Sequence, residues 1–269
     1  MRRAPTTDGE SAVDDVNAVE VRPGNAGQPG QGGPRSAFPD WSFAPNIGNN
    51  PGIYEIENGA LDRGGHVLDA MRQLAPWAGR TIVDLGCGTG FWLARYAGEA
   101  DRVIGIEPDP ALRAKAAART AGMLNVEVAA GSAEHLGLPG CSVDVVHARF
   151  AYFFPPGTDA GLTEVLRVLR PGGSLVVVDN DHRWGEFSTL LAASSLAGPQ
   201  GTAAGTDGWW RERGAIRREV HSEWSFDSRA DLESVLHIEF PAKVADAWLA
   251  RHPVATGLSY GYVLFAVVA

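Results

Sequence analysis

The stretch VDLGCGTG, residues 83–90, decides the fold. It lies between a short apolar run and a segment of helical composition, RTIVDL (80–85) and FWLARYAGE (91–99). Gly86 and Gly88 let the backbone turn tightly and approach a ligand with no Cβ in the way, and Gly90 permits close packing where the helix starts. The first turn of that helix has free N–H groups and partial positive charge, which suit a carboxylate on a ligand. The sequence therefore predicts a strand, a ligand-binding turn and a helix, in that order.

Strand-like and helix-like segments alternate from residue 80 onward. Strands are predicted at 80–85, 101–108, 125–131, 142–148, 174–180, 218–226 and 259–269. Helices are predicted at about 59–76, 91–99, 109–122, 158–173, 184–197, 228–238 and 241–252, with a loop at 199–208. Strands and helices that alternate at this spacing form a mostly parallel α/β sheet with right-handed crossovers, and the last strands indicate an antiparallel edge.

The N-terminal part divides into two segments of different composition. Residues 1–37 include RPGNAGQPGQGGP (22–34), which has no large apolar residue, so we expect a disordered tail outside the fold. Residues 38–58 interleave large apolar side chains with Pro, Gly and Asn, which indicates an irregular segment that packs on something else. We expect residues 38–78 to form a cap whose first part is a mobile lid, the alternative being a fixed strap, and residues 79–269 to form the ligand-binding domain.

Composition and charge narrow the possible partners. The net charge of −9 opposes a broad nucleic-acid surface, and the one arginine cluster, at positions 211, 213, 217 and 218, is typical of a solvated loop and strand edge. No apolar run reaches the roughly 18 residues of a membrane span, and the residues after Met1 are polar, unlike a signal peptide. We therefore expect a cytoplasmic protein, monomeric or homodimeric, that does not bind membranes. The seven histidines and two cysteines show no ligand spacing, so no metal site is expected.

An acidic residue ends the second predicted strand. Glu107, in VIGIEPDP (103–110), lies about 20 residues past the glycine turn, where a carboxylate can accept hydrogen bonds from both ribose hydroxyls. The alternative role, a carboxylate that stabilises the start of a helix, suits Asp109 better. A dinucleotide site needs G-x-G-x-x-G, whereas this chain has G-x-G-x-G with Asp84 two residues ahead, so a nicotinamide dehydrogenase is disfavoured.

This pattern resembles motif I of the class I S-adenosylmethionine-dependent methyltransferases, of the small-molecule, methyltransferase-11-like type. Three later segments are similar to the same family: GSAEHLGLP (131–139), SVDVVHARF (142–150) and EVLRVLRPGGSLVVVDN (164–180). The resemblance covers about residues 80–180. It implies S-adenosyl-L-methionine as cofactor and a doubly wound, Rossmann-like sheet of seven strands, mostly parallel, with an antiparallel last strand. The positions that the resemblance assigns to the cofactor are Asp84, Gly86, Cys87, Gly88, Gly90, Glu107, Pro108, Ser132, Ala133, Glu134, His147, Ala148 and Arg149.

The family has no universal catalytic residue, because attack on a sulfonium methyl group is a displacement that positioning and water exclusion can accelerate. His147 and His182 follow predicted strands and are candidate general bases; the alternatives are a packed core histidine and a solvated turn residue. Tyr54 and Tyr152 are candidates for positioning a substrate. We expect methyl transfer to oxygen, nitrogen or carbon of a small, partly apolar acceptor. A methyltransferase of protein or RNA and a non-methylating cofactor-binding protein remain alternatives.

Overall fold

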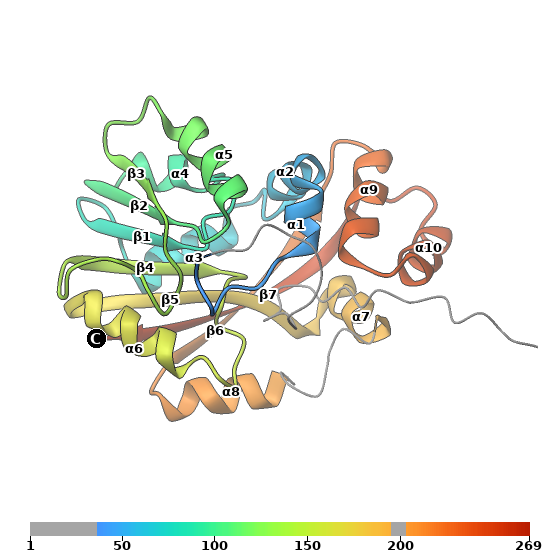
Figure 1. Ribbon diagram of the computed structural model, residues 1–269. Helices are drawn as coiled ribbons and strands as arrows, with labels where there is room; N and C mark the ends of the chain where they lie inside the picture. The colour runs from blue at the N-terminus through green and yellow to red at the C-terminus, as the bar shows by residue number, and fades with distance from the viewer. Residues whose placement is uncertain (1–36, 195–202) are drawn as a thin grey trace, which may run out of the picture.

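Seven strands form one sheet in the computed structural model, which describes residues 37–194 and 203–269 (Figure 1). The strands are β1 Thr81–Leu85, β2 Arg102–Ile106, β3 Val126–Ala129, β4 Val143–Arg149, β5 Leu169–Trp184, β6 Ile216–Ser225 and β7 Gly257–Val268. Their order is β3-β2-β1-β4-β5-β7-β6, parallel from β3 to β5, with β7 antiparallel to both β5 and β6. The predicted fold class, with its antiparallel last strand, is confirmed.

Helices cover both faces of this sheet (Figure 1). They are α1 Pro45–Asn49, α2 Pro51–Ala60, α3 His66–Leu74, α4 Leu93–Ala97, α5 Pro110–Thr120, α6 Asp159–Val168, α7 Gly185–Ala193, α8 Ala203–Glu212, α9 Arg229–Glu239 and α10 Ala242–Arg251. Successive residues of a strand point to opposite faces, so Ile82 belongs to the core cluster that includes residues of α3, α4, α7, α9 and α10, whereas Val83 belongs to the cluster that includes residues of α6 and α8. None of the helices in the described ranges is long and apolar enough to cross a membrane.

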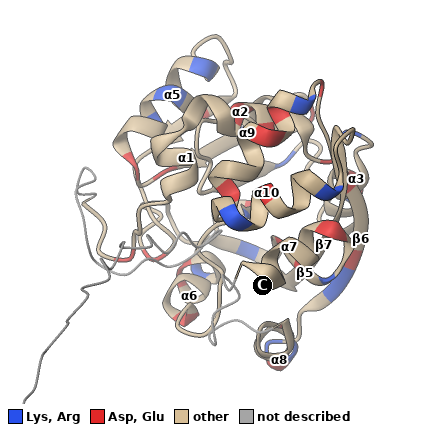
Figure 2. Ribbon diagram, turned by 90° about the vertical axis from the view of Figure 1, so that its right-hand side faces the viewer, with Lys and Arg blue, Asp and Glu red and all other residues tan. Residues whose placement is uncertain are grey.

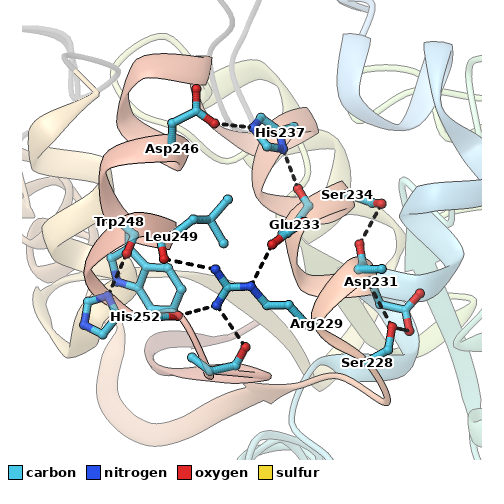
Figure 3. Close-up of polar contacts among 12 residues, drawn as sticks. Ser228, Arg229, Asp231, Glu233, Ser234, His237, Asp246, Trp248, Leu249 and His252 are labelled. Atoms are coloured by element: carbon cyan, nitrogen blue, oxygen red, sulfur yellow. Dashed lines mark hydrogen bonds and ion pairs between the residues drawn. The ribbon is translucent and has the colours of Figure 1, made fainter.

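Arg229 fixes the position of α9 against α10 (Figure 3). Its guanidinium donates to the carbonyl oxygens of Leu249 at 3.0 Å, Ala255 at 3.2 Å and His252, and its Nε donates to Glu233 at 2.7 Å. These carbonyls lie at or beyond the end of α10, where helical C=O groups lack partners within the helix, so one arginine closes that end. The orientation of α9 matters below because its last residue, Glu239, lines the main cavity.

The structure corrects the predicted boundaries in four places. The segment 38–58 is not irregular: α1 and α2 occupy most of it, and each begins with proline at the first helical position, where a missing N–H costs nothing. The helix predicted over 59–76 is shortened to α3, because Gly65 just before it is left-handed, with φ +77°. The loop predicted at 199–208 is replaced from residue 203 by α8. The fifth strand is much longer than 174–180: it runs from Leu169 to Trp184, and its pairing with β7 covers only residues 174–180. The predicted disordered tail, residues 1–37, lies outside the described residues apart from its last position, 37.

Candidate active site

A cavity of about 370 Å³ lies at the carboxyl ends of the parallel strands. β1, β2 and β4 all end there, and the residues that follow each strand line the cavity. The strand order reverses between β1 and β4, and sheets of this kind bind ligands at that crevice. The opposite wall comes from α1, α2, the end of α9 and Tyr260 of β7. The cavity therefore lies between the sheet edge and helices that precede and follow the sheet in the sequence.

The glycine turn after β1 needs its glycines for three separate reasons. Gly86, Gly88 and Gly90 all have left-handed φ, at +72°, +56° and +78°. A Cβ on Gly86 would lie 2.6 Å from the Cβ of Ala151, in the loop after β4. A Cβ on Gly90 would lie 3.0 Å from Ala116 of α5, so Gly90 serves helix packing and does not line the cavity, whereas Gly86 and Gly88 do.

Glu107 is held directly opposite this turn. It is buried, its Oε2 accepts a hydrogen bond from the Gly88 N–H at 2.8 Å, and its Oε1 accepts from the Asp109 N–H at 2.9 Å. Burial raises the pKa of Glu107 to about 7, although both backbone N–H groups lower it. Asp109 caps α5 instead, accepting from the N–H groups of Ala111 and Leu112, as predicted. Glu107 is thus left facing the cavity with its orientation fixed.

Ser132, Ala133 and Glu134 line the cavity beside Pro108. The Oγ atom of Ser132 is buried and has no hydrogen-bond partner among the described residues. The Glu134 carboxylate accepts from the Tyr152 hydroxyl at 2.8 Å, and that hydroxyl accepts from the Gly161 N–H at 3.1 Å. Tyr152 also lines the cavity, but its proton is committed to Glu134, and burial and this carboxylate raise its pKa. Tyr152 therefore holds Glu134, a residue of the cavity wall, in position.

Asp84 and Arg149 lie below the glycine turn and complete this end of the cavity. Burial raises the pKa of Asp84 to about 7, while the Arg149 charge lowers it. The Arg149 guanidinium stacks over Trp92 at 3.4 Å, and its Nε and Nη1 have no hydrogen-bond partner within the described part of the chain. Unpaired N–H groups on a buried guanidinium favour an anionic ligand group. The cavity thus offers both a carboxyl group and a cation at this point.

The structure places neither candidate histidine in the cavity, which corrects both predictions. His147 is fully buried between Trp77 and Tyr96, with ring centroids 5.2 and 5.1 Å away, and burial lowers its pKa to about 3. It is a packed core residue, and Ala148, buried on the opposite face of β4, also lies outside the cavity. His182 lies beside α8, because β5 continues to Trp184 and carries this residue past the cavity.

Two carboxyl groups that sequence analysis missed lie at the other end of the cavity. Glu57 of α2 and Glu239 of α9 are both buried and both line it. Asn46 of α1 donates to Glu239 at 2.7 Å. Burial and the neighbouring Glu239 raise the pKa of Glu57 well above its usual range, and burial raises the pKa of Glu239 to about 6. The two residues are far apart in the chain, so no local spacing connects them. The available signal was that Glu57 lies three residues after Tyr54 on one helix face.

The N-terminal helices contact the glycine turn directly. Glu55 of α2 accepts hydrogen bonds from the Thr89 hydroxyl and the Arg119 guanidinium, which joins α2 to the turn and to α5. Ile47 of α1 reaches within 3.1 Å of the position that a Cβ on Gly88 would take. The segment before the sheet therefore closes the cavity over the turn.

Two of the four arginines in the cluster at 211, 213, 217 and 218 form ion pairs. Arg217 pairs with Asp207 at 2.9 Å and with Glu219 at 2.7 Å, and Arg213 pairs with Asp159. Positive and negative segments are interspersed on the face drawn in Figure 2. No group of three or more metal-ligating side chains occurs within 37–194 and 203–269.

Known proteins share this arrangement over the central part of the chain. Residues 82–173 match the model of a family described as a methyltransferase domain. A ubiquinone/menaquinone biosynthesis C-methyltransferase of Rubrivivax gelatinosus is 36% identical over 139 residues, which cover 51% of this chain and 52% of that protein. An aklanonic acid methyltransferase of a Streptomyces species is 28% identical over 148 residues, which cover 53% of this chain and 67% of that protein.

The chain spans about half the length of the first curated relatives. The crystal structure of the YcgJ protein from Bacillus subtilis matches the fold with a TM-score of 0.55 at 17% identity, covering 76% of this chain and 97% of that one. Sheet order, glycine turn and sequence matches agree: the chain has the fold of the class I methyltransferases, and its residues 82–173 are similar to a methyltransferase domain.

Proposed function

We propose that this protein is an S-adenosylmethionine-dependent methyltransferase that acts on a small-molecule acceptor. The observation that carries the proposal is the Glu107 carboxylate, held by the Gly88 and Asp109 N–H groups so that it faces the cavity beside the glycine turn. A fixed, buried carboxylate with free lone pairs suits two adjacent ribose hydroxyls. The similarity of residues 82–173 to a methyltransferase domain also favours a nucleoside of this kind as the ligand.

Other residues of the cavity fit the remaining parts of the cofactor. Ser132, whose buried Oγ has no partner in the described chain, would meet the adenine edge together with the backbone of Glu134. Gly86 and Gly88 leave room for the methionine part, and the unpaired N–H groups of Arg149 suit its carboxylate. When bound, the cofactor would supply an electrophilic methyl group. The protein's part is to orient both ligands and exclude water.

The form and lining of the cavity favour a small, partly apolar acceptor. Six aromatic side chains contribute to its lining: Trp41, Tyr54, Phe150, Phe154, Phe187 and Tyr260. Residues of α1 and α2 form part of its wall, and its volume of about 370 Å³ suits a small acceptor. The acidic chain and the ion pairs of Arg217 in the arginine cluster also oppose an RNA substrate.

We also propose that residues 38–78 act as a cap whose first part is a lid over this cavity. Its contacts support the idea: Asp40 accepts from the Glu134 N–H at 3.2 Å, and Glu55 reaches both Thr89 and Arg119. The alternative is a fixed strap with the same contacts. A lid would become better protected when the cofactor binds, whereas a strap would be equally protected with and without it.

Transfer of labelled methyl groups tests the proposed function. The full chain is incubated with methyl-labelled S-adenosylmethionine and with either a small-molecule extract or the macromolecular fraction of the same cells. We expect label in small molecules, with loss of labelling in Glu107→Ala and retention in Glu127→Gln, an exposed residue of β3 that pairs with Arg102. Label found only in protein or RNA would contradict the small-molecule assignment. If the chain binds the cofactor but transfers no label to either fraction, a non-methylating cofactor-binding protein would be favoured.

A further inference from the structure

The Glu57–Glu239 pair forms a polar site at the acceptor end of the cavity. Both side chains are about nineteen-twentieths buried, with 6% and 5% of their surface exposed, and both line the cavity. The Oε2 atom of Glu57 is buried without a hydrogen-bond partner among the described residues. A buried acceptor atom left without a partner is costly, so a ligand that donates a hydrogen bond there would be favoured.

Glu57 is the carboxyl group of the pair that holds its proton more strongly. Burial and Glu239 raise the pKa of Glu57 well above the usual range, whereas the pKa of Glu239 is about 6. No lysine or arginine of the described residues forms an ion pair with either carboxyl group, and the groups that donate to Glu239 are the neutral amide of Asn46 and the carboxyl group of Glu57. Adding a proton donor would therefore compensate a desolvated charge.

The other titratable groups that face the pair are neutral donors or lie farther off. Tyr54 of α2 and Tyr260 and Tyr262 of β7 all have their pKa raised by burial and by the nearby carboxyl groups, so they keep their protons. The positive charge of Arg149 on β4 has the opposite effect and lowers the pKa of Tyr54. Tyr54 lies one helical turn before Glu57 and lines the cavity. An O–H donor thus stands beside an acceptor atom, Oε2 of Glu57, that has no hydrogen-bond partner among the described residues.

We propose that Tyr54, Glu57 and Glu239 bind a hydroxyl group on an aromatic or enolic acceptor, and that the Glu239 carboxylate takes the proton of that hydroxyl. This inference rests on the proposed function and deepens it. A hydroxyl group can donate to the carboxyl pair and accept from Tyr54 at the same time, whereas an ammonium group can only donate. Phe187 and Tyr260, which line the same end of the cavity, provide flat apolar walls for the ring that carries the hydroxyl.

The proton transfer is balanced within the site. The O–H bond of the acceptor breaks, its electron pair stays on the acceptor oxygen, and the proton forms a new O–H bond on Glu239. The resulting oxyanion is the electron-rich group that a methyl transfer needs when the neutral hydroxyl is a poor nucleophile. A base with a pKa near 6 is mostly ionised at neutral pH and is poised for this role.

Binding of two matched naphthalenes tests the assignment without an activity assay. Calorimetry measures the affinities of the full chain for 2-naphthol and for 2-methoxynaphthalene at pH 7.5 and pH 5, with and without saturating S-adenosylhomocysteine. At pH 7.5 we expect 2-naphthol to bind about tenfold tighter or better, as one charge-assisted hydrogen bond provides. At pH 5, where Glu239 is protonated, the preference should shrink.

Isosteric variants locate the effect. In Glu239→Gln, the preference for 2-naphthol over 2-methoxynaphthalene should be small at both pH values, as it is for the parent at pH 5. Glu57→Gln and Tyr54→Phe should each lower the parent's preference at pH 7.5 in part. Glu233→Gln, on the same helix but half-exposed and paired with Arg229, should behave as the parent. Equal affinity for the alcohol and the ether, failure of 2-naphthol to bind, a parent-like Glu239→Gln, or tighter binding of 2-naphthylamine would each overturn the proposal. Failure of S-adenosylhomocysteine to bind would instead contradict the proposed function, and the titrations without it would still test the carboxyl pair.

Discussion

Replacing Glu107 by alanine removes the charge that the cavity holds beside the glycine turn. The side chain accepts two backbone hydrogen bonds, at 2.8 Å from Gly88 and 2.9 Å from Asp109, so it is already ordered before a ligand arrives. Each oxygen keeps a further lone pair for one ribose hydroxyl. Losing hydrogen bonds to a charged group costs roughly 1.5–3 kcal/mol, which corresponds to about a 10- to 150-fold weaker affinity. Because this substitution leaves the acceptor end of the cavity unchanged, the loss of affinity should appear in cofactor binding.

Calorimetry with S-adenosylhomocysteine measures this loss directly. Glu107→Gln should lie between the parent and Glu107→Ala, since an amide oxygen can replace one of the two acceptors without the charge. Glu127→Gln, exposed on the neighbouring strand, should bind as the parent does. The reasoning is refuted if Glu107→Ala binds S-adenosylhomocysteine as tightly as the parent while retaining its melting temperature.

Four further predictions follow from the same cavity. Gly88→Val should weaken S-adenosylhomocysteine binding at least tenfold, because φ is +56° there and the new side chain meets Ile47; calorimetry would contradict this by showing parent-like affinity. Affinity should fall as the pH drops below about 7, by up to about tenfold per pH unit, because Glu107, whose pKa is about 7, must be ionised to accept the ribose hydroxyls; a flat profile between pH 5.5 and 8 would exclude this. His147→Leu should leave affinity and its pH profile unchanged, since His147 is a neutral core residue with a pKa of about 3; a changed profile would restore it as a functional group. Amide exchange of α1 and α2 should slow when S-adenosylhomocysteine is added, whereas equal protection would show a fixed strap.

The parallel half of the sheet was predictable because its signals are local. TIVDL is followed at once by glycines that the turn requires, and Asp109 with Pro110 marks the start of α5. The roles of Glu107 and Asp109 could be told apart from the sequence. Asp109 caps the following helix, so the Glu107 carboxylate at the end of the strand remains available for a ligand. The cofactor end of the cavity was therefore largely visible in the sequence.

The acceptor end was not visible, because it is assembled from distant segments. Glu57 and Glu239 meet only when α2 and α9 pack against each other, and nothing near either residue marks the pair. His182 was misplaced because β5 continues to Trp184, beyond the stretch 174–180 that pairs with β7, and local composition does not encode where this strand ends. Pro45 and Pro51 suggested irregular structure but instead begin helices, since proline fits the first helical position as well as it fits a turn.

One titration tests the central claim most directly: calorimetry of the full chain with S-adenosylhomocysteine and, separately, with NAD at pH 8. The carboxylate of Glu107, the orphaned Ser132 hydroxyl and the G-x-G-x-G turn predict one-site binding of S-adenosylhomocysteine that is lost in Gly88→Val and weakened in Glu107→Ala. They predict no binding of NAD, because the turn lacks the spacing that holds a pyrophosphate. Binding of NAD without S-adenosylhomocysteine would contradict the account.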